Sequence, residues 1–148
     1  MATLDDRNSI HSLLARLYDA WARGDGEGYA ACFTEESDYI TFNGIHLRGR
    51  AENAKLHGAL FRSVLKGTKL SAEIDSIELL SSRVALVHTV GTGRKSSYQT
   101  YVLVKSDTEW LIRSFQNTRY QPVSVWMTRW MQKLAGRQRP SVNVDGHR

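Results

Sequence analysis

The spacing of apolar residues changes after Thr68, and this change constrains the fold more than any other feature of the chain. Before Thr68 apolar residues recur at helical intervals, and after it they alternate with polar residues, which is the period of a half-buried strand. The alternation predicts four long strands, over residues 69–80, 83–92, 97–105 and 110–120. Their connections have the length of hairpin turns. We therefore expect a four-strand antiparallel meander in the second half of the chain.

The first half is predicted to hold three helices and one hairpin. Asn43-Gly44 is a strong signal for a two-residue hairpin turn. The predicted elements are a helix capped near its start by Thr3 and Asp6 that ends at Gly24, a short helix capped by Asp25, strands over 38–42 and 45–48, and a helix over 50–66. This order is typical of an α+β fold. We expect residues 1–120 to form a cone-shaped, curved antiparallel sheet wrapped around the three helices, with a small-molecule pocket at its open mouth.

The first long strand changes phase in its middle. The alternation that runs from Leu70 to Ile74 resumes out of phase at Ile77. A bulge near Asp75-Ser76 would account for the change and would bend the sheet.

Charge and cysteine content narrow the classes of function. The net charge is +5, but residues 121–148 carry +4 of it, which leaves +1 for the other 120 residues. No basic stripe with interleaved aromatic residues crosses the main body, so nucleic-acid binding is not expected. Cys32 is the single cysteine, and the N-terminus lacks the pattern of a secretory signal, so we expect a cytoplasmic protein without an internal disulfide.

A C-terminal extension, residues 121–148, follows the predicted domain. An apolar stripe predicts an amphipathic helix over about 123–135; its members are Val123, Trp126, Met127, Trp130, Met131 and Leu134. Packing on the domain or on a dimer partner is the favoured interpretation, because an exposed Trp/Met stripe would be a liability. A lid over the cone mouth and an interfacial membrane helix remain alternatives, although a membrane surface is not expected as a partner. Disorder is expected from Gly136 to Arg148.

Several strings of the chain resemble a known family. DAWARGDGEGYAACFTEESDYITFNGIHLRGR, VALVH, YQTYVLV and WLIRSFQNTR are similar to the SgcJ/EcaC-type family, in the SnoaL-like branch of the superfamily named for nuclear transport factor two. The resemblance implies the α+β cone and homodimers through the sheet. It also implies a setting in antibiotic biosynthesis, because the family includes proteins of enediyne polyketide pathways, and it makes a polyketide synthase a possible partner.

The resemblance does not extend to the carboxylates of the superfamily's steroid isomerase. That enzyme uses a carboxylate base, a Tyr from the first helix and a protonated Asp from the sheet. The matching positions are Thr41 or Phe42 for the base and Gln99 or Thr100 for the acid, whereas Tyr18 matches the helix tyrosine. Carboxylate-based enolisation is therefore not expected here.

Histidine is the remaining side chain that titrates near neutral pH. His88 lies on one strand face with Val84, Leu86 and Val90, and His57 belongs to the third helix. Each is a candidate acid/base, and each can instead be a packed histidine. No metal or other cofactor is expected, because the histidines lie on separate elements without ligand spacing.

The remaining candidates would bind and orient a ligand. Gln116 and Asn117 point to opposite faces of the last strand, so only one can enter the cone. The candidate ligand-binding residues are Tyr18, Trp21, Tyr39, Thr41, Phe61, Thr100, Phe115, Gln116 and Asn117. We expect them to bind a hydrophobic, polyketide-like intermediate. The alternative is an isomerase, cyclase or dehydratase that uses histidine with amide and hydroxyl groups.

Overall fold

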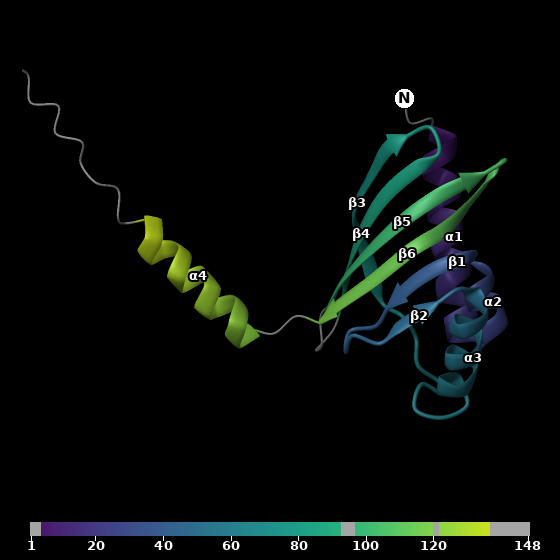
Figure 1. The fold of residues 1–148 in the computed structure, drawn as a ribbon, viewed down its shortest axis with the longest axis horizontal. Coiled ribbons are helices and arrows are strands. Elements are labelled where there is room, and N and C mark those ends of the chain that lie inside the picture. The colour runs from purple at the N-terminus through teal and green to yellow at the C-terminus, as the bar shows by residue number, and fades with distance from the viewer. Residues whose placement is uncertain (1–3, 93–96, 120–121, 137–148) are drawn as a thin grey trace, which may run out of the picture.

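The computed structural model describes residues 4–92, 97–119 and 122–136. These residues form four helices and six strands (Figure 1). The elements are α1 (Leu4–Ala22), α2 (Gly26–Ala31), β1 (Phe33–Ile40), β2 (His46–Arg48), α3 (Arg50–Phe61), β3 (Ala72–Ser81), β4 (Val84–Gly91), β5 (Ser97–Ser106), β6 (Glu109–Arg119) and α4 (Pro122–Gly136). The predicted α+β class is confirmed.

All six strands belong to one curved sheet in the order β2-β1-β6-β5-β4-β3. The predicted hairpin and meander are both present, because β1 pairs antiparallel with β2 and β3 to β6 pair antiparallel in succession. The hairpin joins the meander through a parallel pair of β1 and β6, with Phe33 opposite Ile112. The sequence analysis did not predict this parallel pair. The predicted bulge is confirmed by the register shift between Ile74 and Ser76.

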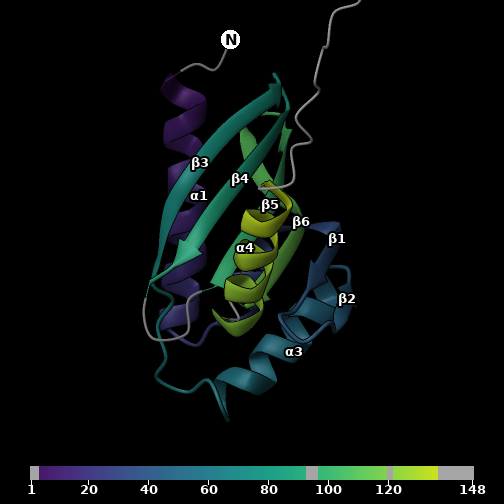
Figure 2. The ribbon, with the colours of Figure 1, turned by 90° about the vertical axis from the view of Figure 1, so that its left-hand side faces the viewer.

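The helix α1 lies along one face of the sheet (Figure 2), and α2 and α3 lie at its lower end beside β1 and β2 (Figure 1). Ile10, Leu13 and Leu17 of α1 are fully buried, as is Ile112 of β6. Burial of such a side chain stabilises the fold by about 1.5–3 kcal/mol. The core therefore lies between α1 and the sheet, and it continues into the lower end of the cone through Tyr29, Tyr39 and Phe61.

The two largest differences from the predicted boundaries are the start of β1 and the end of α3. β1 begins at Phe33 and not at residue 38, because pairing with β6 extends the strand through polar residues that alternation alone would exclude. α3 ends at Phe61 and not at residue 66. The Leu60 carbonyl accepts hydrogen bonds from the amides of both Ser63 and Leu65, which replaces the regular helical pattern, and Val64 is 75% exposed.

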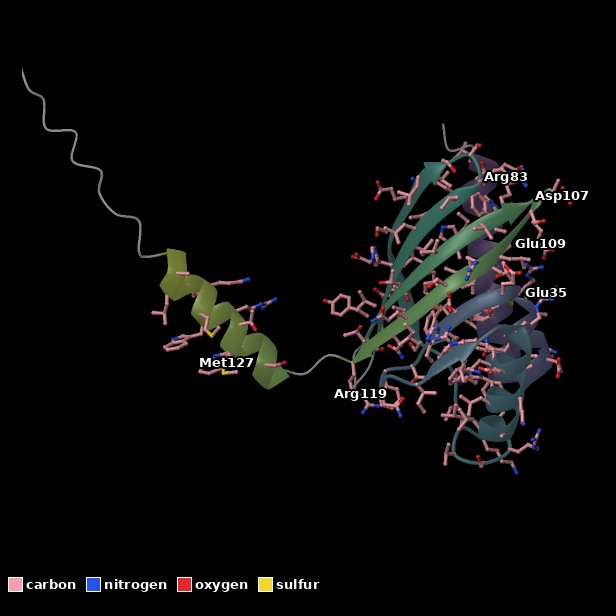
Figure 3. All side chains as sticks on the ribbon, in the orientation of Figure 1. Glu35, Arg83, Asp107, Glu109, Arg119 and Met127 are labelled. Carbon is pink, nitrogen blue, oxygen red and sulfur yellow. The ribbon has the colours of Figure 1, made fainter. Side chains whose placement is uncertain are left out.

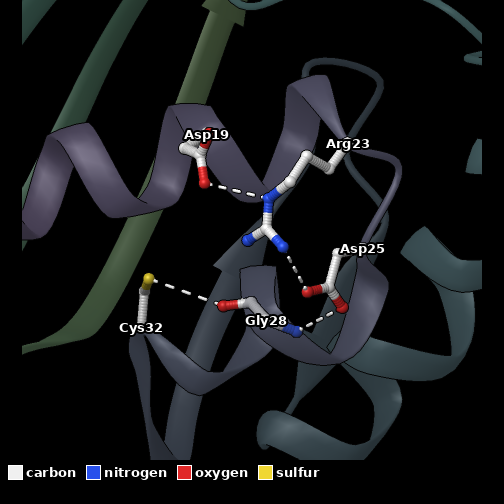
Figure 4. A network of polar contacts seen from close by, with 5 residues as sticks. All are labelled: Asp19, Arg23, Asp25, Gly28 and Cys32. Carbon is white, nitrogen blue, oxygen red and sulfur yellow. Dashed lines mark hydrogen bonds and ion pairs between the residues drawn. The ribbon is translucent and has the colours of Figure 1, made fainter.

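The junction of α1 and α2 is held by a polar network (Figure 4). Asp25 caps α2 as predicted, accepting a hydrogen bond from the Gly28 amide at 2.8 Å. Arg23 bridges Asp19 and Asp25, at 2.9 and 3.6 Å. The Cys32 thiol donates to the Gly28 carbonyl at 3.7 Å, and burial raises its pKa. Cys32 therefore contributes to packing at this junction.

A helix is present at Pro122–Gly136, where the sequence predicts one over 123–135. Its apolar side chains are exposed: Trp126, for example, is 68% exposed and Trp130 is 53% exposed. The expected packing of this stripe is therefore not seen within the described part of the chain, where α4 lies apart from the sheet (Figure 1). The expected disorder beyond α4 concerns residues 137–148, which lie outside the described residues. Within the described ranges, no helix has the length and apolar character needed to cross a membrane.

Candidate functional site

A cavity of about 230 Å³ opens at the lower end of the cone. It lies where β3 and β5 begin and where β4 and β6 end, beside the second half of α1. Its lining residues are Tyr18, Trp21, Tyr39, Lys69, Leu70, Ser71, Ala72, Gly91, Thr92, Ser97, Gln99, Tyr101, Phe115 and Asn117. The cavity therefore occupies the mouth at which the sequence analysis expected a pocket.

Five of the nine predicted ligand-binding residues line this cavity: Tyr18, Trp21, Tyr39, Phe115 and Asn117. They come from α1, β1 and β6, which the curvature of the sheet brings together. Tyr39 and Phe115 are neighbours on the paired strands β1 and β6, with ring centroids 4.5 Å apart. They form one aromatic wall of the cavity.

Phe61 and His57 lie behind that wall and not in the cavity lining. The Phe61 ring packs edge-on against Trp21 at 5.1 Å, and the His57 ring lies 5.8 Å from Trp21 and 5.1 Å from Tyr39. Both residues thus support the rings that line the cavity.

Three predicted site residues lie on the opposite, outer face of the sheet. His88 is paired with Thr100, and Thr100 is paired with Gln116, so the three form a row across β4, β5 and β6. The His88 ring contacts the Ser76 hydroxyl at 3.3 Å. The placement of His88 inside the cone was wrong, because β4 is apolar in both phases and the phase with Val87 is the buried one.

Thr41 was also predicted in the pocket, and the structure places it in the β1–β2 turn. Its hydroxyl accepts from the Ile45 amide at 3.0 Å, and its own amide donates to the Ile45 carbonyl at 3.0 Å. Thr41 therefore closes the hairpin, outside the cavity.

His46 of the same hairpin lies on the outer side of the molecule. Its Nε2 is 2.8 Å from one carboxylate oxygen of Asp38, and Arg113 donates to the other at 3.0 Å. These hydrogen bonds, with His46 contributing most, lower the pKa of Asp38. Asp38 is thus engaged in an ion pair away from the cavity.

The His57 imidazole is neutral at pH 7. Its Nδ1 donates to the Asn53 carbonyl at 3.1 Å, which fixes the tautomer and leaves the lone pair on Nε2. Burial lowers its pKa to about 4, because a charged ring in this aromatic cluster would lose its hydration. A group with this pKa is a weak base near neutral pH.

A row of neutral polar groups crosses the floor of the cavity. The Thr89 hydroxyl donates to the Gln99 carbonyl oxygen at 2.5 Å. The Gln99 amide nitrogen donates to Ser97 at 2.5 Å and to the Asn117 Oδ1 at 3.5 Å. This arrangement leaves the Asn117 NH₂ group as a donor. Gln99, one of two matches to the isomerase acid, points inward, whereas Thr100 points outward.

The tyrosines of the cavity are also neutral donors. The Tyr18 hydroxyl is buried and has no hydrogen-bond partner in the described residues; the Tyr101 and Thr89 hydroxyls face it without reaching hydrogen-bond geometry. Burial raises the pKa of Tyr18 and of Tyr101, and raises that of Tyr39 to about 12. All three phenols therefore keep their protons at pH 7 and can donate hydrogen bonds to an oxygen.

Among the lining residues that the structure describes, Lys69 is the one that is charged, and it is exposed at the mouth. A larger groove of about 860 Å³ lies outside the cone between α2, α3 and β1. Its charges are balanced, with Arg50, Lys55 and Arg62 against Asp25, Glu27 and Glu35. We take the cone cavity as the site, because it combines aromatic walls with buried polar groups.

Within the described part of the chain, no cluster of three or more metal-ligating side chains is present.

The cavity is also lined by residues that were not among the predicted ligand-binding residues: Tyr101, Ser97, Lys69 and the segment around Ser71. Tyr101 could have been predicted from the sequence, because it lies two residues after Gln99 on β5 and so shares its face of the strand. The residues before β3 carry no comparable pattern, since they reach the cavity only through the curvature of the sheet.

Comparison with solved structures assigns the fold to a class. A ketosteroid isomerase-like protein from Erwinia carotovora atroseptica has 18% identity and a TM-score of 0.65, over 78% of this chain and 96% of that chain. An NTF-2 like protein of unknown function from Shewanella oneidensis has 24% identity and a TM-score of 0.64, over 76% and 98%. The chain thus has the NTF2-like, cystatin-like fold, here with a neutral cavity at the cone mouth.

A third solved structure has a higher sequence identity to this chain. A domain of unknown function with a cystatin-like fold from Nostoc punctiforme is 33% identical, with a TM-score of 0.76, and the match covers 91% of this chain and 97% of that domain. The chain belongs to the same family as this domain. No family model and no curated protein matches the chain.

Proposed function

We propose that the protein binds a small hydrophobic molecule that carries a neutral oxygen, such as a ketone or a phenol, in the cone cavity. One observation carries the proposal: the cavity is lined by aromatic rings and neutral hydrogen-bond donors, with no carboxylate among its lining residues. The Tyr18 hydroxyl and the Asn117 NH₂ group would orient the oxygen. An unpaired buried hydroxyl costs roughly 1–3 kcal/mol, so a ligand oxygen that pairs with Tyr18 would recover part of that cost.

The size of the cavity limits the part of a ligand that it can enclose. Pockets for drug-sized ligands measure about 300–1,000 Å³, and this one measures about 230 Å³. It suits one or two fused rings, or the end of a longer chain. The resemblance to the SgcJ/EcaC-type family supports a polyketide-like, enediyne-type intermediate as the natural ligand, with the remainder of the molecule outside the mouth or held by a polyketide synthase partner.

Calorimetric titration with 1-naphthol and naphthalene tests the proposal, because the two probes differ only in the oxygen. We expect 1-naphthol to bind about three- to tenfold more tightly, from the one or two hydrogen bonds that it gains. Tyr18→Phe should reduce this preference and leave naphthalene binding unchanged. Tyr98→Phe, on the outer face, is the matched control. Equal affinity for both probes, or no binding of either, would contradict the proposal.

An isomerase, cyclase or dehydratase activity is the alternative. It is supported by the donors at the cavity, since such groups can stabilise an enolate oxygen. The low pKa of His57 weakens the case for this histidine as the proton carrier. Exchange of the α-protons of 2-tetralone in D₂O, followed by NMR, separates the two roles. A binding protein should leave the buffer rate unchanged, whereas an enzyme should accelerate exchange and lose the acceleration in His57→Phe.

A homodimer through the outer face of the sheet accompanies this proposal. Leu86 and Val102 are neighbours there and are half-buried, and Tyr98 and Leu80 are 51% and 56% exposed. Light scattering should give twice the chain mass for the wild type. The double variant Leu86→Glu/Val102→Glu should give the monomer mass, and a monomeric wild type would refute the dimer.

A further inference from the structure

The open end of the cone differs in charge from the closed end. Asp and Glu are absent from α4 and from the described segments that border the cavity mouth: residues 39–47, 66–72, 89–92, 97–101, 115–119 and 122–136. Glu73, which is paired with Val90, lies just outside these segments. The same segments contain five basic residues, Lys66, Lys69, Arg119, Arg129 and Lys133. The closed end, in contrast, carries charges of both signs, with Asp5, Asp107 and Glu109 beside Arg83 and Lys105. Figure 3 shows the two ends: Arg119 and Met127 lie at one end of the molecule, and Arg83 and Asp107 at the other.

The open end also exposes apolar side chains. Phe42 and Ile45, at the tip of the β1–β2 hairpin, are each 49% exposed, and Tyr98 is 51% exposed. The Arg119 guanidinium lies 3.9 Å from the centroid of the Phe42 ring. The hairpin tip therefore combines an aromatic ring, an aliphatic side chain and a cation at one point of the surface.

The helix α4 starts at this end, because β6 finishes at Arg119 and α4 begins at Pro122. A groove of about 680 Å³ runs between the hairpin tip and α4, with Phe42 on one side and Arg129 on the other. At about 100° per residue, Arg129 and Lys133 flank one edge of the exposed Trp/Met stripe of α4. An exposed apolar stripe with a basic edge is the pattern of helices that lie in a membrane interface.

We propose that the open end of the cone, through α4 and the hairpin tip, docks on the surface of an anionic lipid bilayer. Trp126, Trp130 and the Met side chains of α4 would enter the headgroup boundary, and the basic edge would face the lipid phosphates. Pairing with a second copy of the same surface fits less well, because it would bring basic groups together without acidic partners. An anionic bilayer supplies both the apolar environment and the opposite charge.

Docking in this orientation turns the cavity toward the bilayer. Lys69 and Asn117 line the cavity, and Asn117 also lines the groove beside the hairpin tip. A hydrophobic ligand could then pass between lipid and cavity along this edge without crossing water. Docking itself does not depend on the ligand, so its test is independent of the proposed function.

Co-sedimentation of the full chain with vesicles tests the docking. Binding to phosphatidylcholine vesicles that contain about 30% phosphatidylglycerol is compared with binding to pure phosphatidylcholine vesicles. We expect binding to the anionic vesicles only, weakened by added salt. Neutralising two basic residues near the surface in Arg129→Gln/Lys133→Gln should weaken binding by about 30-fold. The matched control Arg7→Gln/Arg83→Gln has the same net charge but changes the closed end, and should bind as the wild type does.

Trp126→Ser/Trp130→Ser tests the apolar stripe and should also lose binding, while circular dichroism shows that the cone remains folded. The proposal is overturned if the wild type does not bind anionic vesicles, or if both charge variants behave alike. It is likewise overturned if the Trp variant still binds vesicles but changes from dimer to monomer in light scattering. That result would assign the stripe to a contact between two copies.

Discussion

The stability of the protein should depend on pH through His57, which is 3% exposed. Its pKa is about 4 in the folded protein, against an ordinary value of 6.5. Between these values the unfolded chain binds a proton that the folded chain does not, so the free energy of unfolding falls as the pH is lowered. The slope is about 1.4 kcal/mol per pH unit, and the two pKa values are about 2.5 units apart, which gives a loss of about 3 kcal/mol between pH 6.5 and pH 4.

Urea unfolding at several pH values between 4 and 7.5 measures this loss. His57→Phe is the reference variant, because it keeps a ring against Tyr29, 4.5 Å from the His57 ring, and removes the titrating group. The difference between wild type and variant cancels the contribution of the other histidines and the carboxylates. We expect the wild type to lose about 3 kcal/mol more than the variant. Parallel pH profiles, or an NMR titration of the His57 ring near 6.5, would refute the reasoning.

Three further predictions concern packing and burial. In Gly26→Ala the new Cβ would lie 2.6 Å from the Gly58 nitrogen, so urea unfolding should show a loss of about 1–3 kcal/mol; in Gly58→Ala the new Cβ would lie 3.5 Å from Nη1 of Arg62, an ordinary contact, so this variant should not be destabilised. Asp6→Ala removes the acceptor that Lys105 contacts at 2.7 Å, and should cost about 3 kcal/mol, partly restored in Asp6→Asn. Cys32 should react with a thiol reagent only when urea unfolds the chain, since burial raises its pKa and hides its sulfur; rapid labelling of the native protein would contradict this.

Much of the fold could be predicted because its signals are local. The Asn43-Gly44 turn, the meander and the bulge after Ile74 each depend on residues close together in the chain. The parallel pair of β1 and β6 could not be predicted in this way, because alternation shows that a segment is a strand and does not identify its partner. The early start of β1 at Phe33 follows from that same distant pairing.

The site residues were predicted only in part, because a local pattern does not show how distant segments are placed. Periodicity shows which residues share a face, and it correctly placed His88 with Val84, Leu86 and Val90. It does not show which face is buried when both phases are apolar, and so His88 was assigned to the wrong side. Asn117 follows the same rule with a clearer outcome, because its neighbour Gln116 is exposed.

The parallel contact between β1 and β6 also sets an order of events during synthesis and folding. Phe33 and Ile112 are paired across 79 positions of sequence, whereas each hairpin of the meander joins strands that are adjacent in the chain. Closing so long a loop is slow relative to forming a hairpin. The first third of the chain must therefore wait, with its strand edge uncovered, until almost all of the domain has left the ribosome, and β6 then closes the sheet in a late step.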